Sequence, residues 1–241
     1  MTATRRILAL SAGIALAAAL AGCATGASTS GSAPSSAPSP SASAEEVEVD
    51  AAWLNGGTVI GLVSYGSSTC VPTADAVEVL EDGELSVTLA DPPTDEPCTM
   101  DFVPRVTVVD VPADVDPSKD LQIRIEGGDI TATTDLPGVT VAQAPEEYAP
   151  SAGWTGQDDM FVILTWGSST CAPVIESAEP TGPAEVTVTF VPPPDDQVCT
   201  MDMAPRATVA TVSGLEARSD VSLVLTGAEF DGVQVPILGE N

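Results

Sequence analysis

Residues 65–72 read YGSSTCVP, and residues 166–173 read WGSSTCAP. The string GSSTC therefore occurs twice, 101 positions apart, and a proline stands two residues after each of its cysteines. A serine-rich string that recurs in this way is either a duplicated active site or a duplicated structural element. The residues around it, and the residue types that the chain lacks, bear on this choice.

The repetition extends far beyond these letters. Residues 45–110 align with residues 146–211 without a gap, and 25 of the 66 aligned pairs are identical. A period near 100 residues has the length of a domain. We therefore predict two tandem homologous domains, which we call copy 1 (residues 45–145) and copy 2 (residues 146–241).

Apolar and polar residues alternate in several segments of both copies, for example ELSVTLA at 84–90 and EVTVTFV at 185–191. This period of two predicts strands with one buried and one solvated face. By contrast, TVIGLVSY at 58–65 and MFVILTW at 160–166 are apolar on both faces and predict central strands. With five to seven strands expected per copy, the predicted class is all-β. We expect two tandem antiparallel β-sandwiches with immunoglobulin-like architecture.

The first residues have the pattern of an export signal. Arg5 and Arg6 precede an apolar run from Ile7 to Leu20. The run has the length of a signal-peptide core and falls short of the roughly 20 apolar residues that a spanning helix needs.

The tetrapeptide Leu20-Ala21-Gly22-Cys23 follows this run. It closely resembles the lipobox of bacterial lipoproteins. The resemblance implies that residues 1–22 are a signal peptide, that cleavage occurs before Cys23, and that the Cys23 thiol receives a diacylglyceryl group. The alternative is an ordinary secretory signal that is cut near Ala21 or Ala24.

Residues 23–44 form the predicted linker, in which the lipidated cysteine is followed by ATGASTSGSAPSSAPSPSASA. This stretch carries no charge and no large side chain, so it cannot bury a core and is predicted to be a disordered tether. The two copies would then stand off the membrane on its extracytoplasmic face.

Acidic residues dominate the composition, with a formal net charge of -28 at pH 7. Removing Arg5 and Arg6 with the signal would leave five basic residues against 35 acidic ones, a charge of -30. Such a surface repels nucleic acid and anionic lipid, and it is compatible with cations or basic partners.

The chain contains no histidine, and its one lysine is Lys119. These absences exclude Ser-His-Asp and Cys-His catalysis and His-ligated zinc, and they leave no lysine for a duplicated Ser-Lys nucleophile. We assign no catalytic residue, no metal ligand and no cofactor, and we do not expect an enzyme.

Four cysteines remain after Cys23, one pair in each copy. In an exported protein this arrangement predicts the disulfides Cys70–Cys98 and Cys171–Cys199. Bonded cysteines have their Cα atoms about 5 to 6 Å apart, so each bridge would bring GSST beside the CTMD string that begins at the second cysteine. We call this region the corner of each copy.

Two interpretations of the corner compete. In the structural one, the hydroxyls build tight turns and Asp101 pairs with Arg105. In the functional one, amides, hydroxyls and the arginine cradle an anion or a peptide carboxylate. We favour the structural one, because no histidine or lysine could activate a serine there and because an arginine four residues from an aspartate more often pairs with it. The candidate ligand residues are Ser67, Ser68, Thr69 and Arg105 in copy 1, and Ser168, Ser169, Thr170 and Arg206 in copy 2.

Carboxylates offer two further alternatives. Residues 45–50 and 110–120 hold four carboxylates each, but neither stretch has the spacing of an EF-hand calcium loop. A glycoside hydrolase would need a carboxylate pair in an aromatic cleft. Trp53 and Trp154 instead fall at duplicated strand positions, which favours core packing.

The Cys-framed domains are similar to domains of uncharacterised secreted proteins from high-GC Gram-positive bacteria. The resemblance covers each copy in full and implies no known activity. We therefore expect a non-catalytic lipoprotein on the outer face of the cell membrane, acting as a binding or spacer module in the cell envelope. Its expected partner is an envelope protein or a cell-wall component, and not nucleic acid. The alternative function is binding of Ca2+, a small anion or a peptide.

Overall fold

The computed structural model describes residues 47–90, 97–128, 130–141, 144, 146–217 and 219–240. The predicted signal peptide, the lipobox with Cys23 and the linker lie outside these residues. The described part of the chain is all-β apart from a short 3-10 turn at Asn55–Gly57, so the predicted fold class is confirmed. Within that part, no helix is long and apolar enough to cross a membrane.

The strands of copy 2 repeat those of copy 1 in the same order, and the described residues contain seven in each copy. In copy 1 the strands are β1 (Asp50–Leu54), β2 (Val59–Gly66), β3 (Thr73–Val79), β4 (Leu85–Ala90), β5 (Val103–Asp110), β6 (Leu121–Gly127) and β7 (Ile130–Leu136). In copy 2 they are β8 (Ser151–Trp154), β9 (Met160–Gly167), β10 (Val174–Gly182), β11 (Glu185–Val191), β12 (Ala204–Thr211), β13 (Ser222–Gly227) and β14 (Phe230–Leu238).

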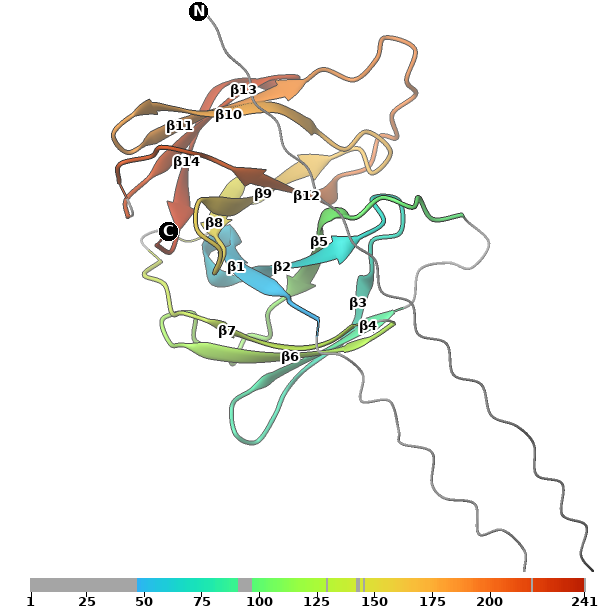
Figure 1. Ribbon diagram of the computed structural model, residues 1–241, viewed down its shortest axis with the longest axis vertical. Coiled ribbons are helices and arrows are strands. Elements are labelled where there is room, and N and C mark those ends of the chain that lie inside the picture. The colour runs from blue at the N-terminus through green and yellow to red at the C-terminus, as the bar shows by residue number, and fades with distance from the viewer. Residues whose placement is uncertain are drawn as a thin grey trace, which may run out of the picture. The chain divides into compact units, whose positions relative to one another are not determined.

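Copy 1 consists of two sheets, with strand orders β1-β2-β5 and β3-β4-β6-β7 (Figure 1). Side chains from both sheets form one core, which includes the almost fully buried Trp53, Ile60, Leu85 and Ile123. The buried tryptophan confirms core packing at this duplicated position. Strand alternation explains the core, because every second residue of β4 and β6 faces inward.

Copy 2 has a core of the same kind, with Trp154, Phe161, Phe190 and Leu223 buried in it. Its strands join into one seven-stranded sheet, because β14 is longer than β7. The β14 strand pairs with β13 along most of its length and then, through Ile237 and Leu238, with β8.

The prediction of purely antiparallel, immunoglobulin-like sheets is wrong. Three of the eleven strand pairs among the described residues are parallel: β4 with β6, β11 with β13, and β14 with β8. In immunoglobulin domains the third and sixth strands share one sheet while the fourth lies in the other. Here the third and fourth strands share the sheet of the sixth, and the fourth lies beside it.

The burial of the strands explains this order. The β4 strand buries Leu85, Val87 and Leu89 on one face, which suits the middle of a sheet. The β3 strand carries Asp75 and Glu78 and is exposed along much of its length, so it suits an edge, where charge also discourages pairing with another chain.

The strands that are apolar on both faces lie between the two copies. Alternate residues of β2 and β9 face the core of their own copy, and the others meet across the pair, where they form a third buried cluster. That cluster contains Ala52, Leu54, Val59 and Val63 of copy 1 and Met160, Val162 and Leu164 of copy 2. Like strands contact one another there, β1 with β8 and β5 with β12. The second apolar face of each strand is thus covered by the other copy.

Candidate functional site

Both predicted disulfides are present and close the corner of each copy. Cys70 and Cys98 have Cα atoms 5.4 Å apart, and Cys171 and Cys199 have Cα atoms 5.5 Å apart. Each bridge links the segment after β2 or β9 to the segment before its antiparallel neighbour, β5 or β12. The GSST and CTMD strings therefore meet where this pair of strands ends, as the sequence predicted.

The hydroxyls of the copy 1 corner form one network that ends on a carboxylate. Thr99 Oγ1 lies 2.8 Å from Ser67 Oγ, 3.2 Å from Ser68 Oγ and 3.4 Å from Thr69 Oγ1. The Thr99 hydroxyl in turn donates to Asp101 Oδ1. Ser67, Ser68 and Thr69, three of the candidate ligand residues, are thus brought together around a threonine.

The backbone amides of the same turn are also paired. The Ser68 amide donates to Asp101 Oδ1 at 3.1 Å, and the Thr99 amide donates to Thr69 Oγ1 at 3.1 Å. An anion cradle needs such amides and hydroxyls to point at its ligand. In this corner the Ser68 amide and the Thr99 hydroxyl donate to Asp101, and the Thr99 amide donates to Thr69, so these groups are already paired within the chain.

This arrangement stabilises the charged form of Asp101. Hydrogen bonds from the Ser68 and Thr99 side chains and from the Ser68 amide lower the pKa of Asp101 to about 2. The carboxylate therefore stays ionised at any pH near neutrality.

Copy 2 reproduces the network position by position. Ser168 Oγ lies 2.8 Å from Thr200 Oγ1, which donates to Asp202, and the Ser169 amide donates to Asp202 Oδ1 at 3.1 Å. Hydrogen bonds from Thr200 and Ser169 lower the pKa of Asp202 to about 2. Thr170 Oγ1 accepts from the Thr200 amide at 3.1 Å.

The arginines lie beneath this network. Arg105 Nη1 donates to the carbonyl oxygen of Cys70 at 2.6 Å and to that of Ser67 at 3.4 Å. The predicted pairing of Arg105 with Asp101 is wrong, because the carboxylate accepts from Ser68 and Thr99 while the guanidinium reaches back to β2 and the turn after it.

Arg206 occupies the same place in copy 2, and its side chain is 8% exposed. Its guanidinium donates to the carbonyl oxygens of Cys171 and Trp166, each at 3.0 Å, and forms an ion pair with Glu229. This partner comes from the turn between β13 and β14, far from the arginine in sequence.

The first letter of GSSTC has a steric explanation. A Cβ added to Gly66 would lie 2.6 Å from Arg105 Cζ, and one added to Gly167 would lie 2.8 Å from Arg206 Cζ. The glycine therefore leaves room for the guanidinium to lie against the strand. The glycine, hydroxyls, cysteine, aspartate and arginine that recur in both copies thus all have a structural role in the corner.

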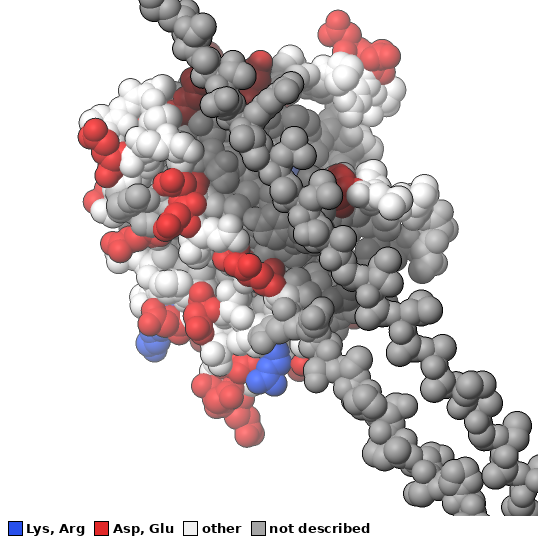
Figure 2. Space-filling model, in the orientation of Figure 1, with Lys and Arg blue, Asp and Glu red and all other residues white. Residues whose placement is uncertain are grey.

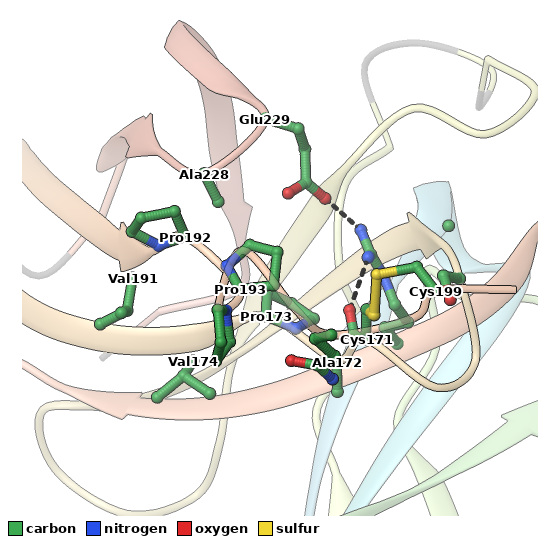
Figure 3. A pocket seen from close by; sticks show the side chains of 15 residues that line it. Cys171, Ala172, Pro173, Val174, Val191, Pro192, Pro193, Cys199, Ala228 and Glu229 are labelled. Atoms are coloured by element: carbon green, nitrogen blue, oxygen red, sulfur yellow. Dashed lines mark hydrogen bonds and ion pairs between the residues drawn. A yellow bond between two sulfur atoms is a disulfide. The ribbon is translucent and has the colours of Figure 1, made fainter.

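A shallow cavity of about 360 Å³ lies beside the copy 2 corner (Figure 3). Its walls are mostly apolar, and the Arg206–Glu229 ion pair lies at one end, next to the disulfide. The wall residues that Figure 3 labels are Ala172, Pro173, Val174, Val191, Pro192, Pro193 and Ala228.

Sequence reasoning missed a group of exposed apolar side chains at the same corners. Met100 and Met201 are fully exposed, with relative exposures of 104% and 101%, and Val198 is 88% exposed. Phe102 and its counterpart Met203 are 78% and 53% exposed. The signal was present in the sequence, because methionine recurs within both CTMD strings. We call Met100 and Phe102 the apolar tip of copy 1, and Val198, Met201 and Met203 the apolar tip of copy 2.

The acidic stretch 110–120 is held by local contacts. Asp116 accepts from the Ser118 hydroxyl at 2.7 Å and pairs with Lys119 at 3.4 Å, and the Ser118 hydrogen bonds lower the pKa of Asp116. Among the described residues no group of three or more His, Cys, Asp or Glu side chains could hold a metal ion. The other stretch, 45–50, lies partly outside those residues.

The chain matches none of the protein-family models, curated proteins or solved structures with which it was compared.

Proposed function

We propose that the chain is a non-catalytic lipoprotein, anchored through Cys23 to the outer face of the cell membrane and acting as a binding module in the cell envelope. Its mature part would be two tandem β-domains, residues 45–145 and 146–241, on the tether of residues 23–44. The observation that best supports a non-catalytic role is that the polar groups of the repeated motif are hydrogen-bonded to one another at the corner.

These hydrogen bonds argue against catalysis by a serine of the corner. A nucleophilic serine needs an adjacent base that removes its proton. Ser67 and Ser168 instead share hydrogen bonds with threonine hydroxyls, and the nearby arginines are engaged with carbonyl oxygens. Because the corner is paired internally in both copies, we assign it a structural role. The function would then depend on contacts made by the exposed surface.

Membrane anchoring is supported by the Leu-Ala-Gly-Cys string after a short apolar run and by the acidic surface. A diacylglyceryl group supplies two acyl chains, and two membrane signals are enough for stable anchoring. With 35 acidic residues and few basic ones, the protein would gain no attraction to anionic lipid from its own charge. A covalent lipid is the anchor that such a chain needs.

The anchor can be tested by labelling cells that express the chain with radioactive palmitate. The expected result is label in wild type, none in Cys23→Ala, and release of that variant from the membrane fraction. Ala24→Ser is the matched control and should label like wild type, because the residue after the cysteine carries no lipid. Equal membrane retention of wild type and Cys23→Ala, with no label in either, would contradict the proposal.

A further inference from the structure

We propose that the apolar tips of the two copies are the docking surface for a cationic, amphipathic segment of a partner protein. This inference deepens the binding role proposed above and rests on it.

Contacts among the described residues leave the tips exposed. Thr99 and Asp101 flank Met100 in the sequence, and both belong to the hydroxyl network. The preceding Cys98 forms the disulfide. Met100, in the middle of this ordered segment, is fully exposed, and so is Met201 in copy 2. Exposed methionine on a surface suits binding, because its flexible, polarizable side chain adapts to many apolar partners.

The tips are presented on a fixed scaffold. A disulfide and a hydroxyl network hold the residues on either side of each methionine, and the Phe102 ring stacks on Tyr65 with centroids 5.7 Å apart. Side chains whose backbone is already ordered lose less entropy on binding. In Figure 1 the segments 97–102 and 192–203 both leave the body on the right-hand side of the view.

The charges around the tips select a cationic partner. Asp101 and Asp202 lie within the tips, and Asp195 and Asp196 are exposed in the same segment as Val198. On the face that Figure 2 shows, acidic groups gather mainly on the left of the described surface, some also stand at its upper right, and the most prominent basic groups lie toward its lower end. Positive charge on a partner that docks at the tips would therefore meet these exposed carboxylates.

The described basic side chains do not offset this charge at the tips. Arg206 is buried beneath its corner, and Arg105 donates to backbone carbonyls of its corner. Lys119 and Arg124 pair with acidic neighbours, Asp116 and Glu84. The positive charges of these four residues are directed to their own chain.

The same charges argue against two other occupants. A lipid surface would have to take up Asp101 and Asp202, whose hydrogen bonds keep them ionised, and burying a charge in hydrocarbon is costly. A second copy of the chain would bring another strongly negative surface against the first. A cationic protein segment meets neither obstacle.

The cavity of copy 2 gives this segment a place for an apolar side chain. Val174 and Val191, which are 61% and 42% exposed, form part of its wall, and Glu229 lies at its end with 46% of its side chain exposed (Figure 3). A volume of about 360 Å³ exceeds that of one large apolar side chain. A basic group next to that side chain would reach the Glu229 carboxylate.

The experiment uses the chain expressed from residue 24 on, which keeps every described residue and carries no lipid. The probe is a synthetic amphipathic peptide of leucine and lysine, about 14 residues long, and binding is measured by fluorescence anisotropy. The tip variant combines Met100→Ser, Phe102→Ser, Met201→Ser and Met203→Ser. The control is Val233→Ser, which removes an apolar side chain that is 37% exposed on β14.

Wild type and control should bind the peptide alike, and the tip variant should bind at least about tenfold more weakly. A peptide with glutamate in place of lysine should not bind, and added salt should weaken the lysine peptide. The tip variant should stay folded, with a melting temperature lowered only by the loss of the Phe102–Tyr65 ring contact, because its replaced side chains are largely exposed.

Equal peptide binding by wild type and the tip variant would overturn the proposal. So would tip-dependent binding of zwitterionic lipid vesicles without peptide binding, or tip-dependent self-association in sedimentation. The chain that begins at residue 24 carries no lipid, so its peptide binding does not depend on the anchor. A negative peptide result would leave the proposed anchor intact, and a negative palmitate result would leave the proposed docking surface intact.

Discussion

Gly153 of copy 2 lies directly against the backbone of Trp53 of copy 1: a Cβ added to this glycine would be 2.0 Å from the Trp53 carbonyl oxygen. The contact joins β8 to β1, beside the buried cluster that the two copies share. Hydrogen bonds cross the same boundary, from the Asn55 amide to Ser151 Oγ at 2.9 Å and from Gln157 Nε2 to Asp50 Oδ2 at 2.6 Å. The copies are thus packed together as closely as the layers within each copy.

Gly153→Ala should therefore destabilise the whole described unit. The new methyl group would meet backbone, which cannot rotate away, so we expect a loss of about 2 kcal/mol or more in the free energy of unfolding, measured with urea. Gly156→Ala is the matched control, since its Cβ would meet only Asp50 Oδ1 at 3.4 Å. Equal stability of the two variants would show that the copies do not pack in this way.

Removing one disulfide by Cys70→Ser with Cys98→Ser should cost about 3.5 kcal/mol, because the bridge closes a loop between positions 28 apart. The equivalent double variant at Cys171 and Cys199 should lose a similar amount. Denaturant unfolding under non-reducing conditions provides the measurement. A loss in one copy only would mean that the two corners are not equivalent.

Arg206→Lys should destabilise the protein by about 1 to 3 kcal/mol although it keeps the charge, because an ammonium group cannot reproduce the planar fork that binds two carbonyl oxygens. Glu229→Gln should cost about 1 kcal/mol or less, since its carboxylate is 46% exposed and the pair is screened by solvent. A larger effect of Glu229→Gln in thermal unfolding would place the main role of Arg206 in the ion pair.

Phosphate should not stabilise the protein through its corners. One amide and one threonine hydroxyl in each corner already donate to Asp101 or Asp202, and Ser67 and Ser168 are hydrogen-bonded to threonine hydroxyls. We expect phosphate to change the melting temperature of wild type and of Arg105→Ala/Arg206→Ala by the same amount. A rise confined to wild type would restore the corner as an anion site.

The corners should contribute to acid stability in a defined range. Asp101 and Asp202 have a pKa of about 2 in the folded protein, below the value of about 3.9 expected for an unfolded chain. A lowered folded pKa gives stability that is complete above about pH 4 and is lost as the pH falls toward 2. In Asp101→Asn/Asp202→Asn, stability measured by circular dichroism should fall less steeply over this range than in wild type.

Local patterns in the sequence predicted much of this structure. Alternation in β4 and β11 and the pairing of the cysteines could be deduced, because each depends on neighbours in sequence or on the duplication. The doubly apolar β2 and β9 were correctly predicted to be buried. That the other copy covers their second face could not be deduced, because a run of apolar residues does not say what lies against it.

The errors have a similar origin. The sequence predicts a pair between Asp101 and Arg105 because the two residues are close in sequence. In the structure Arg105 lies within β5 and reaches the carbonyl oxygens of the turn after β2, the antiparallel neighbour of β5. The partner of Arg206, Glu229, comes from a distant turn that no local pattern connects to it. The exposure of Met100 was missed because an apolar residue is expected inside a fold unless something marks it as functional.

The repeated GSSTC and CTMD strings form a corner in which hydroxyls and amides donate to carboxylates of the same chain. A carbon-13 NMR titration of the Asp101 and Asp202 side chains between about pH 1 and 6 would detect these hydrogen bonds through the pKa of each carboxyl group. The structure predicts a pKa of about 2 for both groups. Ordinary pKa values near 3.9 would show that the hydroxyls and amides do not donate to these carboxylates.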